Sequence, residues 1–195
     1  MPPLVISFFT PDYEAWAQTL IASCERHGYA ADVQAVDLPG LPDWRSRVAQ
    51  KGPAMLAAMR LHGCPLLWLD ADSEIRERPD LFDDPPFDFA ACQAPASGFL
   101  RSGTVYVRPA AWPLLQRTAE LCLLFPQQGH ERNLTAAWLA TRQLYRSEIL
   151  DSAYNTVPSM LDDDDAPDPI YILSNHESGG GYRNPAQPAA EAAPR

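Results

Sequence analysis

The order of apolar segments constrains the fold of this chain more than any other feature. The run LVISFF, from Leu4 to Phe9, is short, continuous and rich in β-branched and aromatic residues, as expected for a buried strand. An amphipathic helical pattern follows it and stops at Gly28, and a second strand pattern covers residues 31–38. Strand, helix and strand in this order predict the beginning of an α/β domain.

The alternation of strands and helices continues to near the end of the chain. Residues 43–63 predict one or two helices with a break at Gly52 and Pro53, and the apolar run 65–69 predicts a strand. Further strands are expected at 87–93, 102–109 and 169–176, and further helices at 112–126 and 131–144. We therefore expect one α/β domain over residues 1–183, followed by a disordered tail at 184–195 that lacks apolar periodicity.

Composition and charge narrow the class of protein. At 195 residues, 46% of them hydrophobic, the chain is long enough for one core. The formal net charge of −10 speaks against a large basic face for nucleic acid, although it leaves a local basic groove open. The first residues lack the basic flank and cleavage site of a signal peptide, and their apolar run is too short to span a membrane.

The cysteines indicate a reducing environment. They form no CxxC pair and no cluster with histidine at the spacing of a zinc site. Because each falls in or beside an apolar pattern, we expect reduced, mostly buried thiols and a cytoplasmic location. The four residues are Cys24, Cys64, Cys92 and Cys122.

Two carboxylates follow the strand expected at 65–69. Ligands of open α/β sheets bind beyond the carboxyl ends of the strands, which is where Asp70 and Asp72 lie. In an extended segment both side chains point to the same side, so they could hold one divalent cation. Alternatively, Asp70 simply ends the strand and Asp72 caps a turn.

The order of several segments around these aspartates resembles that of the GT-A family of nucleotide-diphospho-sugar transferases, especially its small glycogenin-like and galactosyltransferase-like members. The resemblance implies a single-domain, Rossmann-like GT-A fold, whose mixed central sheet is flanked by helices. Three details depart from the family pattern: Gly52 separates Lys51 from Pro53, Arg132 follows the acidic residue Glu131, and the segment SAYNTVPS lacks the leading proline of its family counterpart. The segments are VISFFTPDYEAW, DWRSRVAQKGPAML, LLWLDADSEIRERPDLFD, SGTVYVRP, HERNLTAAWL, SAYNTVPS and IYILSNHESGGGYR.

The resemblance implies a metal site for the donor diphosphate. Mn²⁺ or Mg²⁺ would be held by Asp70, Asp72 and His176 and would bridge the phosphates of a nucleotide sugar. A nearby cation, for which Lys51 and Arg183 are the candidates, would also stabilise charge on the leaving group. Without the resemblance, His176 would be interpreted as a surface histidine.

Other residues of the resembling segments would surround the donor. Thr10 and Tyr13 would meet the base and ribose, but they could equally be a helix cap and a core residue. Glu131 is, with Asp72, a candidate catalytic residue that would orient the sugar hydroxyls or act nearer the acceptor. Its alternative role is that of an acid at a helix N-terminus.

Ser102 and Gly103 are expected beside the donor sugar, where glycine would let the backbone approach the ligand, although the same pair could be an ordinary strand entry. Arg45, Arg47 and Arg101 are further candidates to meet phosphate or an anionic acceptor.

These implications lead to a metal-dependent glycosyltransferase that moves a sugar, from UDP-sugar in the first instance, to an acceptor hydroxyl with retention. The acceptor stays open between a glycan, a protein, a small molecule and a modified DNA base, and a homo-oligomer could complete the acceptor side. A sugar nucleotidyltransferase or a metal-dependent hydrolase could use the same carboxylates, although the first strand is not followed by the glycine-rich loop of a nucleotidyltransferase. A catalytically inactive GT-A binding module is the non-enzymatic alternative.

Overall fold

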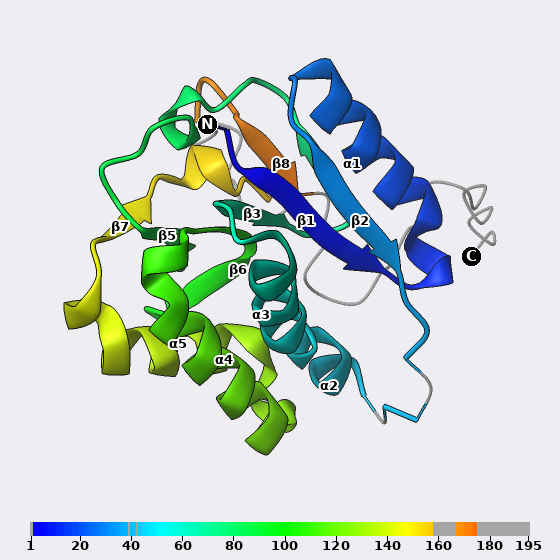
Figure 1. The fold of residues 1–195 in the computed structure, drawn as a ribbon. Coiled ribbons are helices and arrows are strands. Elements are labelled where there is room, and N and C mark those ends of the chain that lie inside the picture. Colours follow the sequence, from blue (N-terminus) through cyan, green and yellow to red (C-terminus); the bar gives the residue numbers. More distant parts are fainter. Residues whose placement is uncertain (1, 39, 42, 158–166, 175–195) are drawn as a thin grey trace, which may run out of the picture.

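A mixed six-stranded sheet is the centre of the computed structural model, which describes residues 2–38, 40–41, 43–157 and 167–174 (Figure 1). Its strands lie in the order β2-β1-β3-β6-β5-β7, and β4 and β8 form a small second sheet. The strands are β1 (Leu4–Phe9), β2 (Ala31–Ala35), β3 (Leu66–Leu69), β4 (Ser73–Ile75), β5 (Phe89–Gln93), β6 (Leu100–Val107), β7 (Ser147–Leu150) and β8 (Ile172–Ser174).

Strand β6 runs against its neighbours. β1 pairs in parallel with β2 and β3, and β5 pairs in parallel with β7, whereas β6 is antiparallel to both β3 and β5. Because Leu69 at the end of β3 pairs with Thr104, the beginning of β6 meets the carboxyl ends of β1 and β3. Side chains from the ends of parallel strands and from the start of β6 are therefore brought to one edge of the sheet.

Helices cover both faces of the sheet. α1 lies on one face, and α3, α4 and α5 pack together on the other, with the short α2 beside them (Figure 1). The α-helices are α1 (Glu14–Arg26), α2 (Trp44–Ala49), α3 (Lys51–His62), α4 (Trp112–Leu124) and α5 (Gly129–Thr141). Short 3₁₀ helices are η1 (Pro11–Tyr13), η2 (Asp80–Phe82), η3 (Pro109–Ala111), η4 (Pro126–Gln128), η5 (Arg142–Leu144) and η6 (Ser152–Tyr154).

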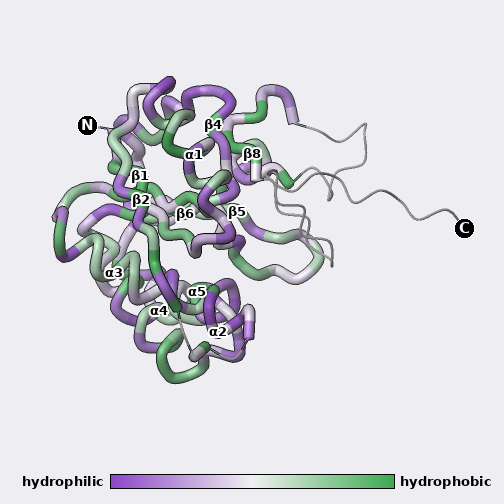
Figure 2. The backbone as a smooth tube through the Cα atoms, turned by 90° about the vertical axis from the view of Figure 1, so that its right-hand side faces the viewer, coloured by the Kyte–Doolittle hydropathy of each residue, from purple (hydrophilic) through white to green (hydrophobic). Residues whose placement is uncertain are grey.

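The core consists of one apolar layer on each side of the sheet. Within β3, Leu66 and Trp68 join the layer under α3 and α4, whereas Leu67 and Leu69 join the layer that contains α1. All four side chains are buried, which explains why β3 is a continuous apolar run rather than an alternating one. Figure 2 shows the same pattern, with hydrophobic residues concentrated in the central strands.

The structure corrects several predicted boundaries. The break between α2 and α3 falls at Gln50, before Gly52 and Pro53, which both lie in the first turn of α3. Gly52 instead allows close packing of α3 on α4, because a Cβ there would lie 2.9 Å from Cys122 Sγ. The second strand ends at Ala35 rather than at residue 38, and β4 and β7 had not been predicted.

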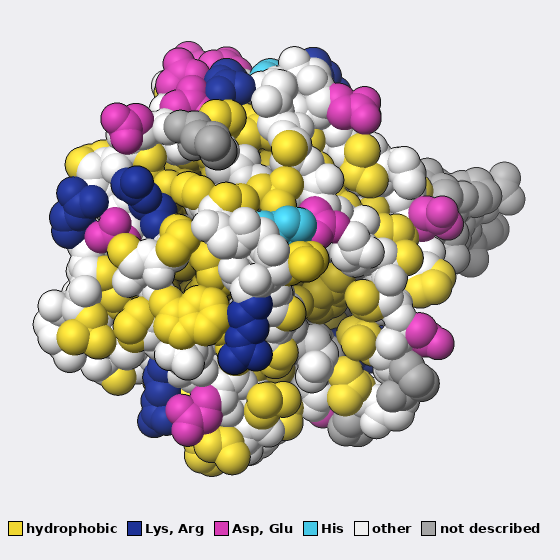
Figure 3. All heavy atoms as spheres, viewed as in Figure 1, with side chains coloured by type: hydrophobic (Ala, Val, Ile, Leu, Met, Phe, Trp, Pro, Cys, Tyr) yellow, Lys and Arg dark blue, Asp and Glu magenta, His cyan; other side chains and the backbone are white. Residues whose placement is uncertain are grey.

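The cysteines, the surface charge and the end of the domain were also subjects of prediction. Cys24, Cys92 and Cys122 are buried and Cys64 is partly buried, and all four thiols are free, as predicted. No helix in the described part of the chain is long and apolar enough to cross a membrane. On the face shown in Figure 3, Lys and Arg side chains are separated by apolar and acidic groups. The expected domain end at 183 and the tail 184–195 lie outside the described residues.

Candidate active site

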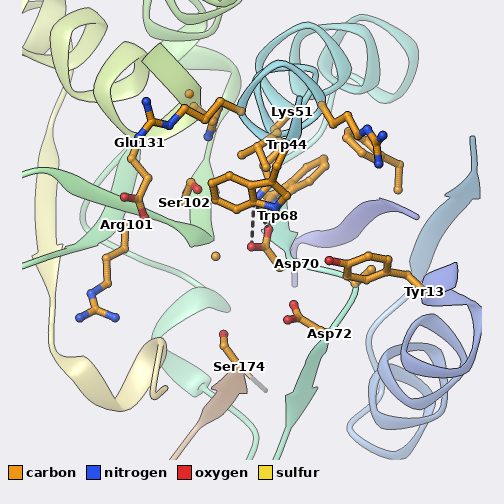
Figure 4. Close-up of a pocket in the computed structure, with 18 of the residues that line it drawn as sticks. Tyr13, Trp44, Lys51, Trp68, Asp70, Asp72, Arg101, Ser102, Glu131 and Ser174 are labelled. Carbon is orange, nitrogen blue, oxygen red and sulfur yellow. Dashed lines mark hydrogen bonds and ion pairs between the residues drawn. The ribbon is translucent and has the colours of Figure 1, made fainter. Parts of the chain in front are cut away.

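A cleft of about 700 Å³ opens at the edge of the sheet where β1 and β3 end and β6 begins. Every predicted site residue within the described ranges lines this cleft, namely Thr10, Tyr13, Lys51, Asp70, Asp72, Ser102, Gly103 and Glu131. The remaining two predicted site residues, His176 and Arg183, lie outside the described residues. The predicted residues are therefore brought together from five separate segments of the chain (Figure 4).

Asp70 and Asp72 lie in a tight turn rather than in an extended segment, contrary to the prediction. β3 ends at Leu69, and the backbone amide of Ser73 donates to the carbonyl of Asp70 at 2.9 Å. The backbone amide of Asp70 in turn donates to the carbonyl of Gly103, which joins the turn to β6. Both aspartates still line the cleft, and Asp72 is almost fully buried.

Lys51 and Trp68 hold the carboxylate of Asp70. Lys51 Nζ lies 2.6 Å from Oδ1 and 2.8 Å from Oδ2 of Asp70, and Trp68 Nε1 donates to Oδ1 at 2.8 Å. Lys51 is the only lysine in the chain, and its side chain is 11% exposed. This ion pair was not predicted, and it places one positive charge against the carboxylate of Asp70.

The space beside Gly103 is filled by protein. A Cβ at Gly103 would lie 2.8 Å from Asn155 Oδ1 and 3.3 Å from Asn155 Nδ2. Gly103 is thus required by the asparagine that packs on it, whereas the sequence predicted that its lack of a side chain makes room for the ligand. Ser102 and Gly103 also lie within β6 and not at its entry.

Helix α5 contributes its first turn to the cleft. Thr135 Oγ1 accepts from the backbone amide of Leu100 at 2.9 Å, which fixes α5 against β6. Burial raises the pKa of Glu131 above its usual value, while Lys51 and the Ser102 backbone amide partly oppose that rise. The side chain of Glu131 nevertheless stays in contact with the solvent of the cleft.

His130 precedes Glu131 and was missed by the sequence analysis. Its side chain is buried, and both ring nitrogens lack a hydrogen-bond partner among the described residues. Burial, and then the charge of Lys51, lower the pKa of His130 to about 3. The imidazole is therefore neutral at physiological pH.

Aromatic and basic side chains line the remaining walls. Tyr13 is half-buried at the cleft and is not a core residue. The Thr10 hydroxyl donates to Asp12 and caps no backbone amide. Arg45, Arg47 and Arg101 all reach the cleft. Other lining residues that sequence reasoning missed include Trp44, Trp68, Asn155 and Ser174.

The residues of the cleft fit a hard divalent cation. In the described part of the chain, no group of three or more Asp, Glu, His or Cys side chains is arranged so that it could hold a metal ion by itself. Magnesium sites, however, commonly combine one or two carboxylates with water and phosphate oxygens, and Asp70 and Asp72 supply two such carboxylates. Oδ1 of Asp70 already accepts from Lys51 and Trp68, whereas Oδ2 accepts from Lys51 alone, so an ion at Oδ2 would compete with Lys51 for this carboxylate.

Solved structures of other proteins share this architecture. One similar structure is a glycosyltransferase involved in the glycosylation of the major capsid of PBCV-1, with 14% identity and a TM-score of 0.71 over 92% of this chain and 95% of that one. The chain has a GT-A-like glycosyltransferase fold. Neither a protein-family profile nor a curated protein matches it.

Further structures with the GT-A-like fold are larger. The glycosyltransferase GlyE of Streptococcus pneumoniae TIGR4 shares 14% identity, with a TM-score of 0.62 over 91% of this chain. Its apo form gives 15% identity and a TM-score of 0.61. The chain spans 55% of either GlyE structure. The predicted mixed sheet flanked by helices is thus confirmed at the level of the fold.

Proposed function

We propose that this chain transfers a sugar from a nucleotide diphosphate donor, in the first instance a UDP-sugar, to an acceptor hydroxyl. The observation that carries the proposal is the convergence of Lys51, Asp70, Asp72 and Glu131 on one cleft of a GT-A-like fold. Two carboxylates and a lysine in one cleft suit a ligand that carries a diphosphate together with a cation.

Asp70 and Asp72 would hold Mn²⁺ or Mg²⁺, and His176 is the proposed third protein ligand. When bound, the ion would neutralise charge that develops on the leaving nucleoside diphosphate. Lys51, released from Asp70, would face the same phosphate oxygens with its ammonium group. Because the Lys51 side chain is largely buried, its charge would act on the phosphate oxygens more strongly than a cation in water would. Arg183 is proposed as a second cation for the diphosphate.

Residues on either side of Asp70 in the cleft would place the sugar and the base (Figure 4). Glu131 would accept hydrogen bonds from sugar hydroxyls, and Ser102 lies beside it on β6. Thr10 and Tyr13, which follow β1, would contact the base and ribose. We expect retention at the anomeric carbon, in line with the resemblance to glycogenin-like enzymes, and NMR of the product anomer tests this.

A cytoplasmic location is also proposed. All four cysteines are free thiols, as expected in a reducing compartment. Burial raises the pKa of Cys24 and Cys92 to about 12 and that of Cys122 to about 11, which keeps these three thiols protonated and unreactive.

The test is a melting screen of UDP- and GDP-sugars with Mn²⁺, followed by donor hydrolysis with the compound that stabilises the protein. Asp72→Asn should lower hydrolysis at least about 100-fold, because the variant loses a carboxylate that would hold the metal ion, and the ion would neutralise the charge on the leaving group. Asp88→Asn is the matched control, since Asp88 is equally buried but pairs with Arg146 outside the cleft. Full activity of Asp72→Asn, or no binding of any donor by the wild type, would contradict the proposal.

A further inference from the structure

Asn155 occupies a buried position at the floor of the cleft. It follows η6, is 5% exposed and lines the cleft. Its backbone amide donates to the carbonyl of Ser152 at 2.9 Å, and the next residue, Thr156, exchanges backbone hydrogen bonds with β8. The backbone on both sides of the asparagine is therefore held in place.

The orientation of the Asn155 side chain is set by two neighbours. Ser174 Oγ donates to Oδ1 at 2.8 Å, so the oxygen of the amide faces β8. The plane of the amide packs on Gly103, where any Cβ would collide with Oδ1. With Oδ1 engaged and one side covered by Gly103, Nδ2 has a fixed direction.

Nδ2 of Asn155 is a donor that the protein leaves unused. It has no acceptor among the described residues, yet it is not one of the fully enclosed, unpartnered polar atoms, so it keeps access from the cleft. Asn133 shows the usual arrangement: it is also buried, but its Nδ2 donates to the carbonyl of Phe125 at 3.1 Å. A nearly buried donor that belongs to a cleft-lining residue and has no acceptor among the described residues is expected to meet an acceptor on a ligand.

We propose that Asn155 is a substrate-binding residue whose Nδ2 donates a hydrogen bond to an oxygen of the diphosphate or sugar of the bound nucleotide sugar. This inference rests on the proposed function for the identity of the ligand. Ser174 orients Asn155, and its Oγ also lies 3.4 Å from Oγ of Ser73, the residue after Asp72. Asn155 is therefore connected to the turn that would bind the diphosphate, and Ser174 is a positioning residue for it.

Two variants of Asn155 separate the donor from the shape of the side chain. Asn155→Leu keeps a similar size without a donor, and Asn155→Asp keeps an acceptor for Ser174 Oγ but places a carboxylate oxygen where Nδ2 lies. Binding of UDP, UDP-glucose, UDP-galactose, GDP and GDP-mannose is measured by calorimetry with Mn²⁺. We expect about tenfold weaker binding for Asn155→Leu and a larger loss for Asn155→Asp, which adds repulsion from phosphate.

The pattern across ligands identifies the contact. An equal loss for UDP and the UDP-sugars assigns the bond to the diphosphate, and a loss confined to the sugars assigns it to the sugar. Asn133→Asp is the control, since it disturbs a buried asparagine outside the cleft and should leave affinity unchanged whatever its effect on melting. Wild-type affinity in both Asn155 variants would overturn this inference while the proposed function stands. Failure of the wild type to bind any of the five ligands would overturn both.

Discussion

The two walls of the cleft hold their ionisable groups in opposite ways. At the end of β3, Asp70 is a carboxylate held by Lys51 and by the indole of Trp68. At the start of α5, the buried imidazole of His130 has no partner among the described residues, and the pKa of Glu131 is raised. The first wall thus holds an ion pair, whereas the surroundings of the second shift His130 and Glu131 toward their neutral forms.

The largest expected effect concerns the neutral wall. The unfolded chain protonates His130 near pH 6.5, whereas in the folded state its pKa is about 3. The contribution of this residue to stability is therefore present above pH 6.5 and is lost as the pH falls toward 3, by about 1.4 kcal/mol per pH unit. In His130→Leu that dependence should disappear. Urea unfolding of both proteins between about pH 4 and about pH 7 measures this dependence. If the unfolding free energies of the two proteins changed with pH in parallel, a buried neutral imidazole would be contradicted.

A smaller effect is expected at the charged wall. Removal of the ammonium group in Lys51→Met leaves Asp70 without its cation, so Mn²⁺ alone should bind roughly tenfold more tightly than to the wild type. Nucleotide sugar should bind more weakly to the same variant, because the diphosphate loses a cation. Calorimetry with each ligand separates the two effects. Weaker Mn²⁺ binding by Lys51→Met would show that Lys51 and the ion do not compete for Asp70.

The wild type offers an independent check of that competition. Since Lys51 is the only lysine, an amine-selective reagent has one side-chain target in the chain. Mn²⁺ alone should increase labelling of Lys51 as it leaves Asp70, and Mn²⁺ with a bound donor should suppress it, as measured by mass spectrometry.

The smallest effect is expected for Glu131→Gln. The raised pKa means that the fold disfavours the carboxylate, so glutamine should raise the melting temperature at pH 7 by about 1 °C, a small gain because solvent in the cleft screens the charge. The gain should vanish as the pH falls below the usual glutamate value of 4.5, where both states are protonated. An equal change at pH 4 and pH 7 would assign it to packing instead.

The same contrast explains what sequence could and could not predict. The apolar run before Asp70 marks β3 and its carboxyl end directly, and the order of segments predicted which residues surround the cleft. The partner of Asp70 could not be predicted in this way, because it depends on how α3 packs beside β3. His130 was missed for a similar reason, since a histidine beside an exposed glutamate carries no local sign of full burial.

The role of Gly103 shows a further limit of sequence reasoning. A Ser-Gly pair in a strand indicates a close approach, but not whether a ligand or another part of the chain makes that approach. Here Asn155, from a segment beyond β7, fills the space, and the antiparallel insertion of β6 between β3 and β5 brings the two together. Such contacts depend on strand order, which local periodicity does not encode.

The pairing of β4 with β8 has a consequence for biosynthesis. Ser73, directly after Asp72, contacts Ser174 across 101 residues of sequence, and Ser174 also orients Asn155. During translation the central sheet can assemble as soon as β7 has left the ribosome, but the acidic turn and its asparagine acquire their final supports only when β8 follows. A chain that ended before β8 would hold all six strands of the central sheet but lack the supports of the acidic turn and of Asn155.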